Sequence, residues 1–427
     1  MRGRDAGISR RDFVKAAVAI GGASALAACV EREGEVDVPT GPDDPSTLPE
    51  RQHAWNAFLA TDDHGNDVPP RHHVVLLLDY AGPGTPDDAD RDAVETALRS
   101  LERSYRRGND GLLFTMGYAP AYFDRFDESL PDSVDLPAPT ALSPFEQPDL
   151  DTPDAVLHLA SDHGQVLLAA EEALFGEREG ANGVSFEASL GDVFDRADRR
   201  TGFIGSGLPA SHQDVSGIPE DHPVPEDAPL YMGFKAGFKR NQASETRVTI
   251  PDGPFAEGTT QHLSKLDLRL HDWYGEQEYD ERVAEIFCPA HAAEGRVEGV
   301  GENLGDSSGV QDGCPEHVED HANEYGRVGH AQKAATVRED DSPLILRRDF
   351  DSTDGDRAGL HFLALQRGVA DFAATKQALN ATDLVERNPA IRQRVNNGIL
   401  EYTFVKRRGN YLLPPRRHRA LPAPRPE

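Results

Sequence analysis

"RHHVVLLLDY" at residues 71–80 is a short apolar run of the kind that forms a buried strand. A segment with apolar residues at helical spacing follows at 87–107, and a second apolar run, "GLLFTMGYA", follows at 111–119. The helical segment opens with aspartates, which favour a helix N-terminus because they complement the helix dipole. This strand–helix–strand order predicts an α+β fold.

The same order of elements extends along the rest of the chain. A strand and a helix are expected at 155–162 and 164–176. The second half repeats the pattern, with segments at 258–287, 342–350, 359–366 and 368–380. We therefore expect two ferredoxin-like domains of the dimeric α+β barrel type, at 69–200 and 201–412, with helices packed on antiparallel sheets.

Three polar segments lie outside this pattern. Residues 30–68 are polar and contain prolines, which predicts a flexible tether. The acidic, glycine-rich stretch 292–325 is expected to be an exposed insertion in the second domain. The basic, proline-rich end at 413–427 is expected to be loose.

The first 29 residues have the pattern of an export signal rather than of a folded element. Arg10 and Arg11 precede an apolar stretch rich in glycine and alanine, as in twin-arginine signals. That stretch ends in Leu-Ala-Ala-Cys, with Cys29 as the residue that would receive a lipid. We expect export by the twin-arginine route and a lipid anchor at Cys29, on the outer face of the cytoplasmic membrane or outside the cell.

Net charge limits the partners. The chain has 74 acidic and 44 basic residues, for a formal net charge of −30. Such a surface repels nucleic acid and anionic membranes, so a membrane contact is expected only through the lipid. An acid excess with little lysine is typical of a protein from a salt-loving organism, such as a haloarchaeon.

Cysteines and histidines give weak signals on their own. Cys288 and Cys314 lie in loop-like segments and form a candidate disulfide outside the cell. They have no Cys-x-x-Cys spacing, so they do not predict a zinc site. The histidines at 72–73 suit a solvated strand end better than a metal site. The chain contains no phosphate-binding glycine loop and no Gly-x-Ser-x-Gly nucleophile motif.

His330 is the strongest candidate ligand. Its neighbours Gly329, Ala331, Ala334 and Ala335 are small, so a flat group can approach closely. The expected strand at 342–350 ends in Arg347 and Arg348, which places a cation within reach of a shared cavity. A neutral imidazole can hold haem iron while a fixed cation stabilises charge on bound peroxide.

Several segments, taken together and in order, resemble the dye-decolourising (DyP-type) haem peroxidases. The resemblance covers about residues 70–410 and rests on five stretches of this sequence. They are "GLLFTMGYAPAYFDRF" (111–126), "AVLHLASDHGQVLLAAEEAL" (155–174), "FAEGTTQHLSKLDLRLHDWYGEQEYDERVAEIF" (255–287), "GHAQKAATVREDDSPLILRRDFDS" (329–352) and "AGLHFLALQRGVADFAATKQAL" (358–379).

The resemblance implies roles for individual residues. His330 matches the histidine that binds the iron of haem b, and Arg347 matches the arginine that assists cleavage of the peroxide O–O bond. Phe362 matches an apolar residue beside the same site, whereas His361 stands where the family more often has leucine. Relatives often form dimers or larger rings, so a homo-oligomer is a further expectation.

One departure bears directly on activity. The family motif Gly-Phe-x-Asp-Gly corresponds to Gly233–Gly237, where Ala236 replaces the aspartate that moves the peroxide proton. General acid–base help is commonly worth a factor of about 10² to 10⁴. The expected function is therefore an exported haem-dependent peroxidase with an unidentified electron donor. The alternatives are a non-catalytic haem- or ligand-binding surface lipoprotein and a protein of exported haem or iron handling.

Overall fold

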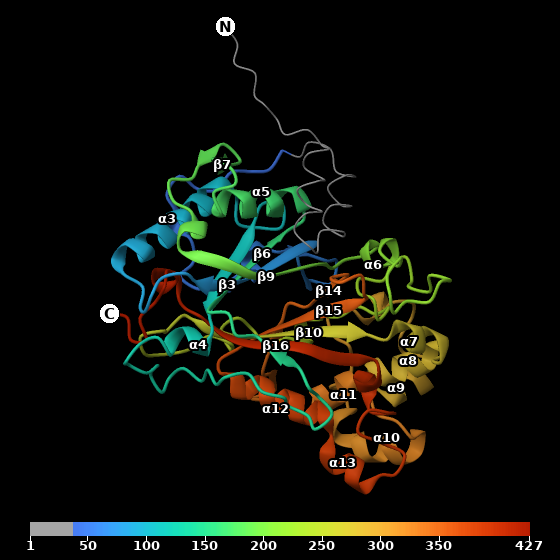
Figure 1. Ribbon diagram of the computed structural model, residues 1–427. Helices are drawn as coiled ribbons and strands as arrows, with labels where there is room; N and C mark the ends of the chain where they lie inside the picture. Colours follow the sequence, from blue (N-terminus) through green and yellow to red (C-terminus); the bar gives the residue numbers. More distant parts are fainter. Residues whose placement is uncertain (1–36) are drawn as a thin grey trace.

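The computed structural model describes residues 37–427 (Figure 1). The expected export signal, Cys29 and the first part of the tether lie outside the described residues. One large sheet contains the strands β3 (His72–Tyr80), β4 (Leu113–Tyr118), β5 (Asp149–Leu150), β6 (Ala155–Ser161), β9 (Phe194–Phe203), β10 (Thr259–Leu268), β13 (Leu346–Arg347), β14 (Phe350–Ser352), β15 (Gly359–Gln366) and β16 (Thr403–Leu413).

The helices expected within 87–107, 164–176, 258–287 and 368–380 are present, and further short helices lie between them. The main ones are α3 (Asp88–Ser104), α5 (Gly164–Leu174), α8 (Tyr279–Ile286), α10 (Val318–Tyr325) and α12 (Val369–Asn380). Shorter ones are α4 (Pro120–Phe123), α6 (Leu208–Ser211), α7 (Leu270–Gly275), α9 (Pro289–Ala293), α11 (His330–Ala334) and α13 (Thr382–Arg387). Three small hairpins pair β1 (Ala60–Thr61) with β2 (Asp67–Val68), β7 (Gly180–Ala181) with β8 (Val184–Ser185), and β11 (Arg338–Glu339) with β12 (Ser342–Pro343).

Strand order confirms the predicted α+β fold. In the first half, β3 pairs with β6 and β9, and β4 pairs with β6. In the second half, β10 pairs with β15 and β16, and β13 and β14 pair with β15. Each half thus has its first strand in the centre and its second beside its third, which is the ferredoxin-like order. Single residue pairs, Asp351 with Phe203 and Leu412 with Tyr118, join the halves into a closed ring.

Side chains alternate along β3, so its two faces pack into two different apolar layers. On β3, Val75 and Leu77 face the other half of the sheet, where they join Leu263 and Leu363. The intervening residues of β3 pack with helices α3 and α5, which lie together over the strands of the first half (Figure 1). Because both faces of β3 are covered, its sequence is a continuous apolar run rather than an alternating one. The expected strand at 342–350 is divided into β12, β13 and β14.

The tether prediction is wrong for the part of 30–68 that the structure describes. Trp55 is buried, and the guanidinium carbon of Arg348 lies 4.3 Å from the centroid of its ring. Asp62 accepts a 2.7 Å hydrogen bond from the Lys235 ammonium. These contacts come from long-range partners in the folded body, so the polar composition of the segment did not reveal them.

The other two polar segments are also packed. In the C-terminal tail, Arg419 and Leu421 are buried, and Arg416 and Arg419 bind the carboxylate of Glu102. The stretch 292–325 contributes Val297, Val300 and Val310 to an apolar cluster, so it is not a solvated flap. The expected border between domains, at 200–201, falls inside β9, and the division of the chain into these domains stays a prediction.

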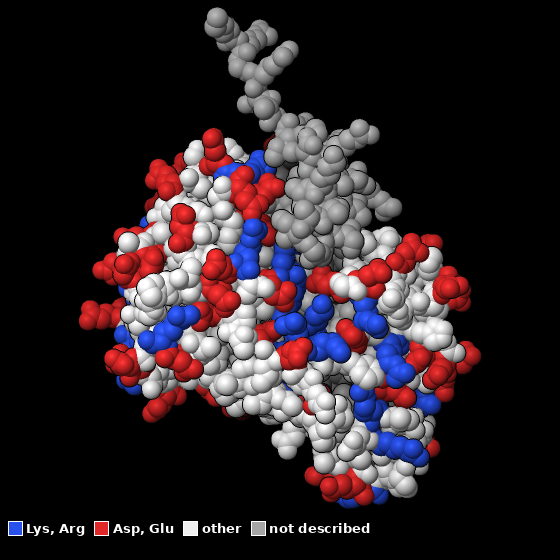
Figure 2. Space-filling model, viewed as in Figure 1, with Lys and Arg blue, Asp and Glu red and all other residues white. Residues whose placement is uncertain are grey.

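Acidic side chains dominate the outline of the molecule. Figure 2 shows them dispersed over the visible face, with lysine and arginine gathered in a band through its middle. None of the helices within residues 37–427 is long and apolar enough to cross a bilayer.

The tail provides a stability test. Replacing Arg419 by alanine should lower the free energy of unfolding by about 2–4 kcal/mol, because the buried carboxylate of Glu102 loses one of its two arginines. Urea unfolding followed by tryptophan fluorescence measures this loss. Arg425→Ala, at a half-exposed arginine of the same tail, should change the value by less than about 0.5 kcal/mol. Equal small effects would show that the tail does not pack as described.

Candidate functional site

A cavity of about 520 Å³ lies against the second half of the sheet. Its walls come from α11, α12, the strands β10, β15 and β16, and the loop that contains Phe234–Phe238. Most of the lining is apolar, with aromatic rings from Phe234, Phe238, Phe287, Phe362 and Phe372. A volume of this size is within the range of about 300–1,000 Å³ that holds small molecules and cofactors.

His330 begins α11 and lines this cavity. Its backbone is held closely, because a Cβ atom at Gly398 would come within 2.9 Å of the His330 nitrogen. Gly398 has a φ of 61°, so glycine suits both the conformation and the space. On the next turn, the buried Lys333 ammonium donates to the carbonyl oxygens of Leu379 (2.7 Å) and Asn397 (2.9 Å). The small helix is thus fixed on two sides.

The imidazole of His330 is neutral at neutral pH. Burial lowers its pKa to about 3, with Lys333 and Arg347 adding to the effect. Its Nδ1 is buried and has no hydrogen-bond partner among the described residues. An unpaired buried polar atom costs roughly 1–3 kcal/mol. Because His330 also lines the cavity, a ligand bound there can reach its neutral imidazole, which makes His330 a candidate cofactor ligand.

Arg347 lines the same cavity, at the end of β13, and pairs with an acid. Its Nη1 donates to Asp349 Oδ2 at 3.1 Å. Gln242 fixes the arginine backbone, since its Oε1 accepts from Arg347 N (3.0 Å) and its Nε2 donates to Arg347 O (3.2 Å). The arginine and the acid are two positions apart in an extended segment, so their side chains share one face.

Asp349 is a proton-transfer candidate. Burial raises the pKa of this carboxyl to about 6, although the Arg347 ion pair and the hydrogen bond from Leu363 N lower it. A group with a pKa near neutrality is suited to general acid–base chemistry. Asp351, which accepts from Tyr231 N, also lines the cavity, and burial raises its pKa well above the ordinary value.

Ala236 lines the same cavities as this pair. A second cavity of about 310 Å³ adjoins the first, and Leu230, Ala236, Arg347 and Asp349 line both. The position that lacks the expected aspartate therefore shares both cavities with a different acid. Sequence reasoning missed Asp349. The acid after the arginine pair in "LRRDF" is its only signal, and it is weak in so acidic a chain.

The alternation of side chains along β15 explains why His361 and Phe362 point to opposite faces of the sheet. Phe362 lines the cavity, next to Phe372. His361 points to the other face of β15, where its Nε2 lies 3.1 Å from Asp354 Oδ2 and its ring packs near Phe350. His361 is fully buried in that position and takes no part in the cavity.

Arg348, Cys288 and Cys314 do not line the larger cavity, although Arg348 lines the smaller one together with Arg347 and Asp349. Arg348 Nη2 donates to Glu245 Oε1 (3.0 Å) and to His53 O (2.8 Å), so this arginine holds the N-terminal segment. Cys288 and Cys314 form a disulfide with a Cα–Cα distance of 6.5 Å. Lys235 lines the cavity but bonds to Asp62, which neutralises its charge.

Comparison with known proteins gives a family and a fold. No curated protein sequence matches the chain. The sequence model described as "Family of unknown function (DUF7405)" matches residues 70–415.

Solved structures of DyP-type proteins are similar in fold. A dye-decolorizing peroxidase from Bacteroides thetaiotaomicron aligns with a TM-score of 0.52 at 13% identity, covering 86% of this chain and 99% of that one. The dye-decolorizing protein from V. cholerae aligns with a TM-score of 0.51 at 12% identity, covering 86% and 98%. At such identities the likeness shows the fold alone, which is that of the DyP-type peroxidases.

Asp349 should leave a signature in stability. Its pKa is raised from 3.8 in the unfolded chain to about 6 in the folded protein, so the folded state favours the protonated acid. Protonation of Asp349 therefore stabilises the fold increasingly as the pH falls through 6 towards 4. Between pH 7 and pH 4, the unfolding free energy of the wild type relative to Asp349→Asn should therefore rise by about 2–3 kcal/mol. Urea titrations of both proteins at each pH measure the difference. A difference independent of pH would contradict the raised pKa.

Proposed function

We propose that this chain, which belongs to the DUF7405 family of unknown function, is an exported haem-binding protein that reduces hydrogen peroxide. One observation carries the proposal: His330 and the Arg347–Asp349 pair line a single cavity. Haem b is proposed as the cofactor because the sequence resembles the DyP-type peroxidases. The electron donor is an organic or metal reductant that the sequence does not identify.

The residues of the cavity fit a haem. Its apolar walls suit the flat ring, and the unpartnered imidazole of His330 suits the iron. Arg338 and Arg394 also line the cavity, and neither forms an ion pair with a described carboxylate. Arg394 donates to the backbone oxygens of Glu401 and Thr403, so a cation is held there for an acidic group such as a propionate.

Each side chain would have a defined part in peroxide reduction. Bound haem would supply the iron that takes the oxidising equivalents of the peroxide. His330 would bind that iron as a neutral imidazole. The Arg347 guanidinium would stabilise negative charge that develops on the departing oxygen. Asp349, when ionised, would accept the proton of the attacking peroxide oxygen and return it to the other oxygen, which leaves as water.

A second candidate is haem or ligand binding without turnover, at the cell surface or in iron handling. Ala236 favours it, because alanine carries no proton where the DyP-type motif has an aspartate. Export by the twin-arginine route and lipidation at Cys29 belong to both proposals, as does assembly into a homo-oligomer. Peroxide turnover distinguishes the two candidates.

The cofactor is tested first. The chain reconstituted with haem in high salt should show a sharp Soret band, and His330→Ala should shift or lose that band because the iron loses its ligand. His271→Ala, at an exposed histidine, is the matched control and should leave the spectrum unchanged. Absence of a haem band in all three proteins would reject both the peroxidase and the haem-binding proposals.

The acid is tested by turnover. Asp349→Asn should lower peroxide turnover by a factor of about 10² to 10⁴, because the amide cannot move a proton. In the wild type, turnover should fall as pH drops through about 6, the pKa of Asp349, and the variant should lack this limb. Stopped-flow spectroscopy with peroxide measures both.

A compensating variant sharpens the test. Ala236→Asp in the Asp349→Asn background places an acid beside the same arginine and should restore part of the turnover. Asp356→Asn, at a surface turn, is the control with an equal change of charge. Full activity in Asp349→Asn would reject this acid as the proton carrier, and absence of turnover in the haem-loaded wild type would favour the binding proposal.

A further inference from the structure

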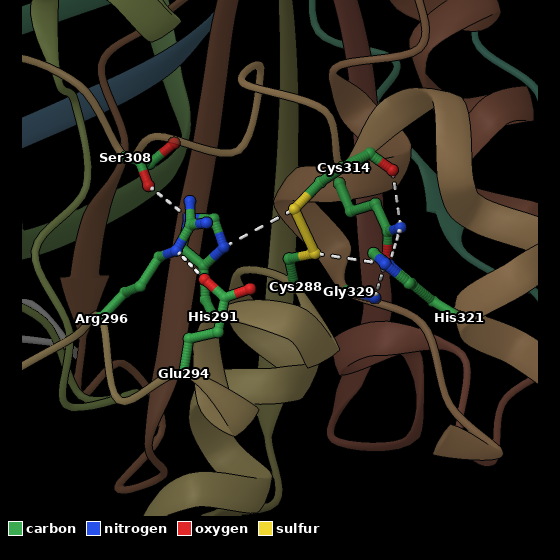
Figure 3. Close-up of a disulfide and its surroundings, with 9 residues drawn as sticks. Cys288, His291, Glu294, Arg296, Ser308, Cys314, His321 and Gly329 are labelled. Carbon is green, nitrogen blue, oxygen red and sulfur yellow. Dashed lines mark hydrogen bonds and ion pairs between the residues drawn. A yellow bond between two sulfur atoms is a disulfide. The ribbon is translucent and has the colours of Figure 1, made fainter. Parts of the chain in front are cut away.

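Two histidines flank the Cys288–Cys314 disulfide, one on each side (Figure 3). His291 Nδ1 lies 3.5 Å from Cys314 Sγ, and His321 Nδ1 lies 3.5 Å from Cys288 Sγ. All four side chains are at most 9% exposed. Sulfur and imidazole nitrogen are the ligands that zinc prefers in closed protein sites.

The hydrogen bond of the His291 ring to Ser308 shows which ring nitrogen carries the free lone pair. Its Nε2 lies 3.1 Å from the backbone oxygen of Ser308, which can only accept, so the ring proton is on Nε2. Nδ1 therefore presents a lone pair to Cys314 Sγ. A disulfide sulfur carries no proton, so this buried nitrogen gains no hydrogen bond from it. Metal-binding histidines are oriented in the same way, by an N–H donated to a carbonyl on the far side of the ring.

Local structure brings the ligand atoms together. Cys288 is the N-cap of α9, and His291 lies three positions further, on the same side of the helix. Cys314 caps the short helix Pro315–His317 and reaches the pair from the other end of the 292–325 stretch. The two Sγ atoms and His291 Nδ1 all lie within 4.8 Å of one another. In a tetrahedral zinc site such atoms are roughly 3.5–3.8 Å apart, so small side-chain rotations suffice.

We propose that, after reduction of the disulfide, Cys288, His291 and Cys314 bind one Zn²⁺ ion, with water in the fourth position beside His321. The proposal assigns two states to one site. A dithiol reductant gives two electrons and two protons to the disulfide and is itself oxidised to a disulfide. Zinc then displaces the two thiol protons and binds the thiolates. Zinc itself changes no oxidation state.

This site is connected to the helix that carries His330. Gln332, on α11, donates through its Nε2 to Cys314 O (2.8 Å) and to His321 Nδ1 (2.8 Å). Its Oε1 accepts from the backbone nitrogen of Gly329 (3.1 Å), just before His330. The proposed metal site is therefore joined through Gln332 to the segment that positions His330, whether or not that histidine binds haem.

Metal titration of the full chain tests the proposal. The protein is reduced with a phosphine under anaerobic conditions, freed of reductant, and titrated with Co²⁺ and then Zn²⁺. Reduced wild type should bind one Co²⁺ with the visible absorption of a tetrahedral ion and a thiolate charge-transfer band, both lost on addition of Zn²⁺. The disulfide form of the same protein should show neither band.

Matched variants separate the site from the acidic surface. His291→Ala should weaken Zn²⁺ binding at least about tenfold in competition with a chromophoric chelator. His317→Ala, at a nearby exposed histidine paired with Asp320, should not change it. The proposal is overturned if reduced wild type shows no thiolate charge-transfer band, or if His291→Ala and wild type bind Zn²⁺ equally. Because its cysteines cannot bind metal, the disulfide form measures any Zn²⁺ binding by surface carboxylates.

Discussion

The cavity depends on one constraint, the pairing of β10 along both of its edges. Ser264 of β10 stands opposite Phe362 of β15 on one side and Arg408 of β16 on the other, and all three line the cavity. The adjacent Leu263 points to the opposite face and joins the core between the two halves of the sheet. Since side chains alternate along a regular strand, a shift of one residue at this point would exchange these sets. The register of β10 therefore decides which residues a ligand meets.

Buried charged groups of this molecule fall into two kinds, those neutralised by a close ion pair and those whose pKa stays perturbed. Where it holds the chain together, each charge is paired closely, as with Arg200 and Asp151 or Arg419 and Glu102. Asp349 differs, because burial outweighs its ion pair with Arg347 and leaves its pKa raised. Strongly perturbed carboxyls that line a cavity are more typical of working sites than of structural pairs. The contrast separates Asp349 and its cavity neighbour Asp351 from the acids of the closely paired structural bridges.

The sequence predicts the helices and strands whose apolar residues recur at regular spacing. It indicates the two ferredoxin-like halves, and it singles out His330, Arg347 and Phe362, which the structure brings to one cavity. It does not indicate contacts between distant polar residues. Charged, proline-containing ends have the composition of disordered chains, and only the fold shows that their arginines meet buried carboxylates. Asp349 was missed for the same reason: nothing in an acidic sequence distinguishes a buried acid from an exposed one.

In the proposed peroxide reduction, Asp349 would take the part that the aspartate of the DyP-type motif would have at position 236. An acid on the loop would depend on that loop for its distance from Arg347. Asp349 instead follows the arginine in a segment paired to β15, where Arg348 N donates to Leu363 O (2.8 Å) and Leu363 N donates to Asp349 Oδ1 (3.3 Å). The backbone thus fixes the acid and the arginine relative to each other. Proton transfer needs such fixed geometry more than it needs a particular place in the sequence.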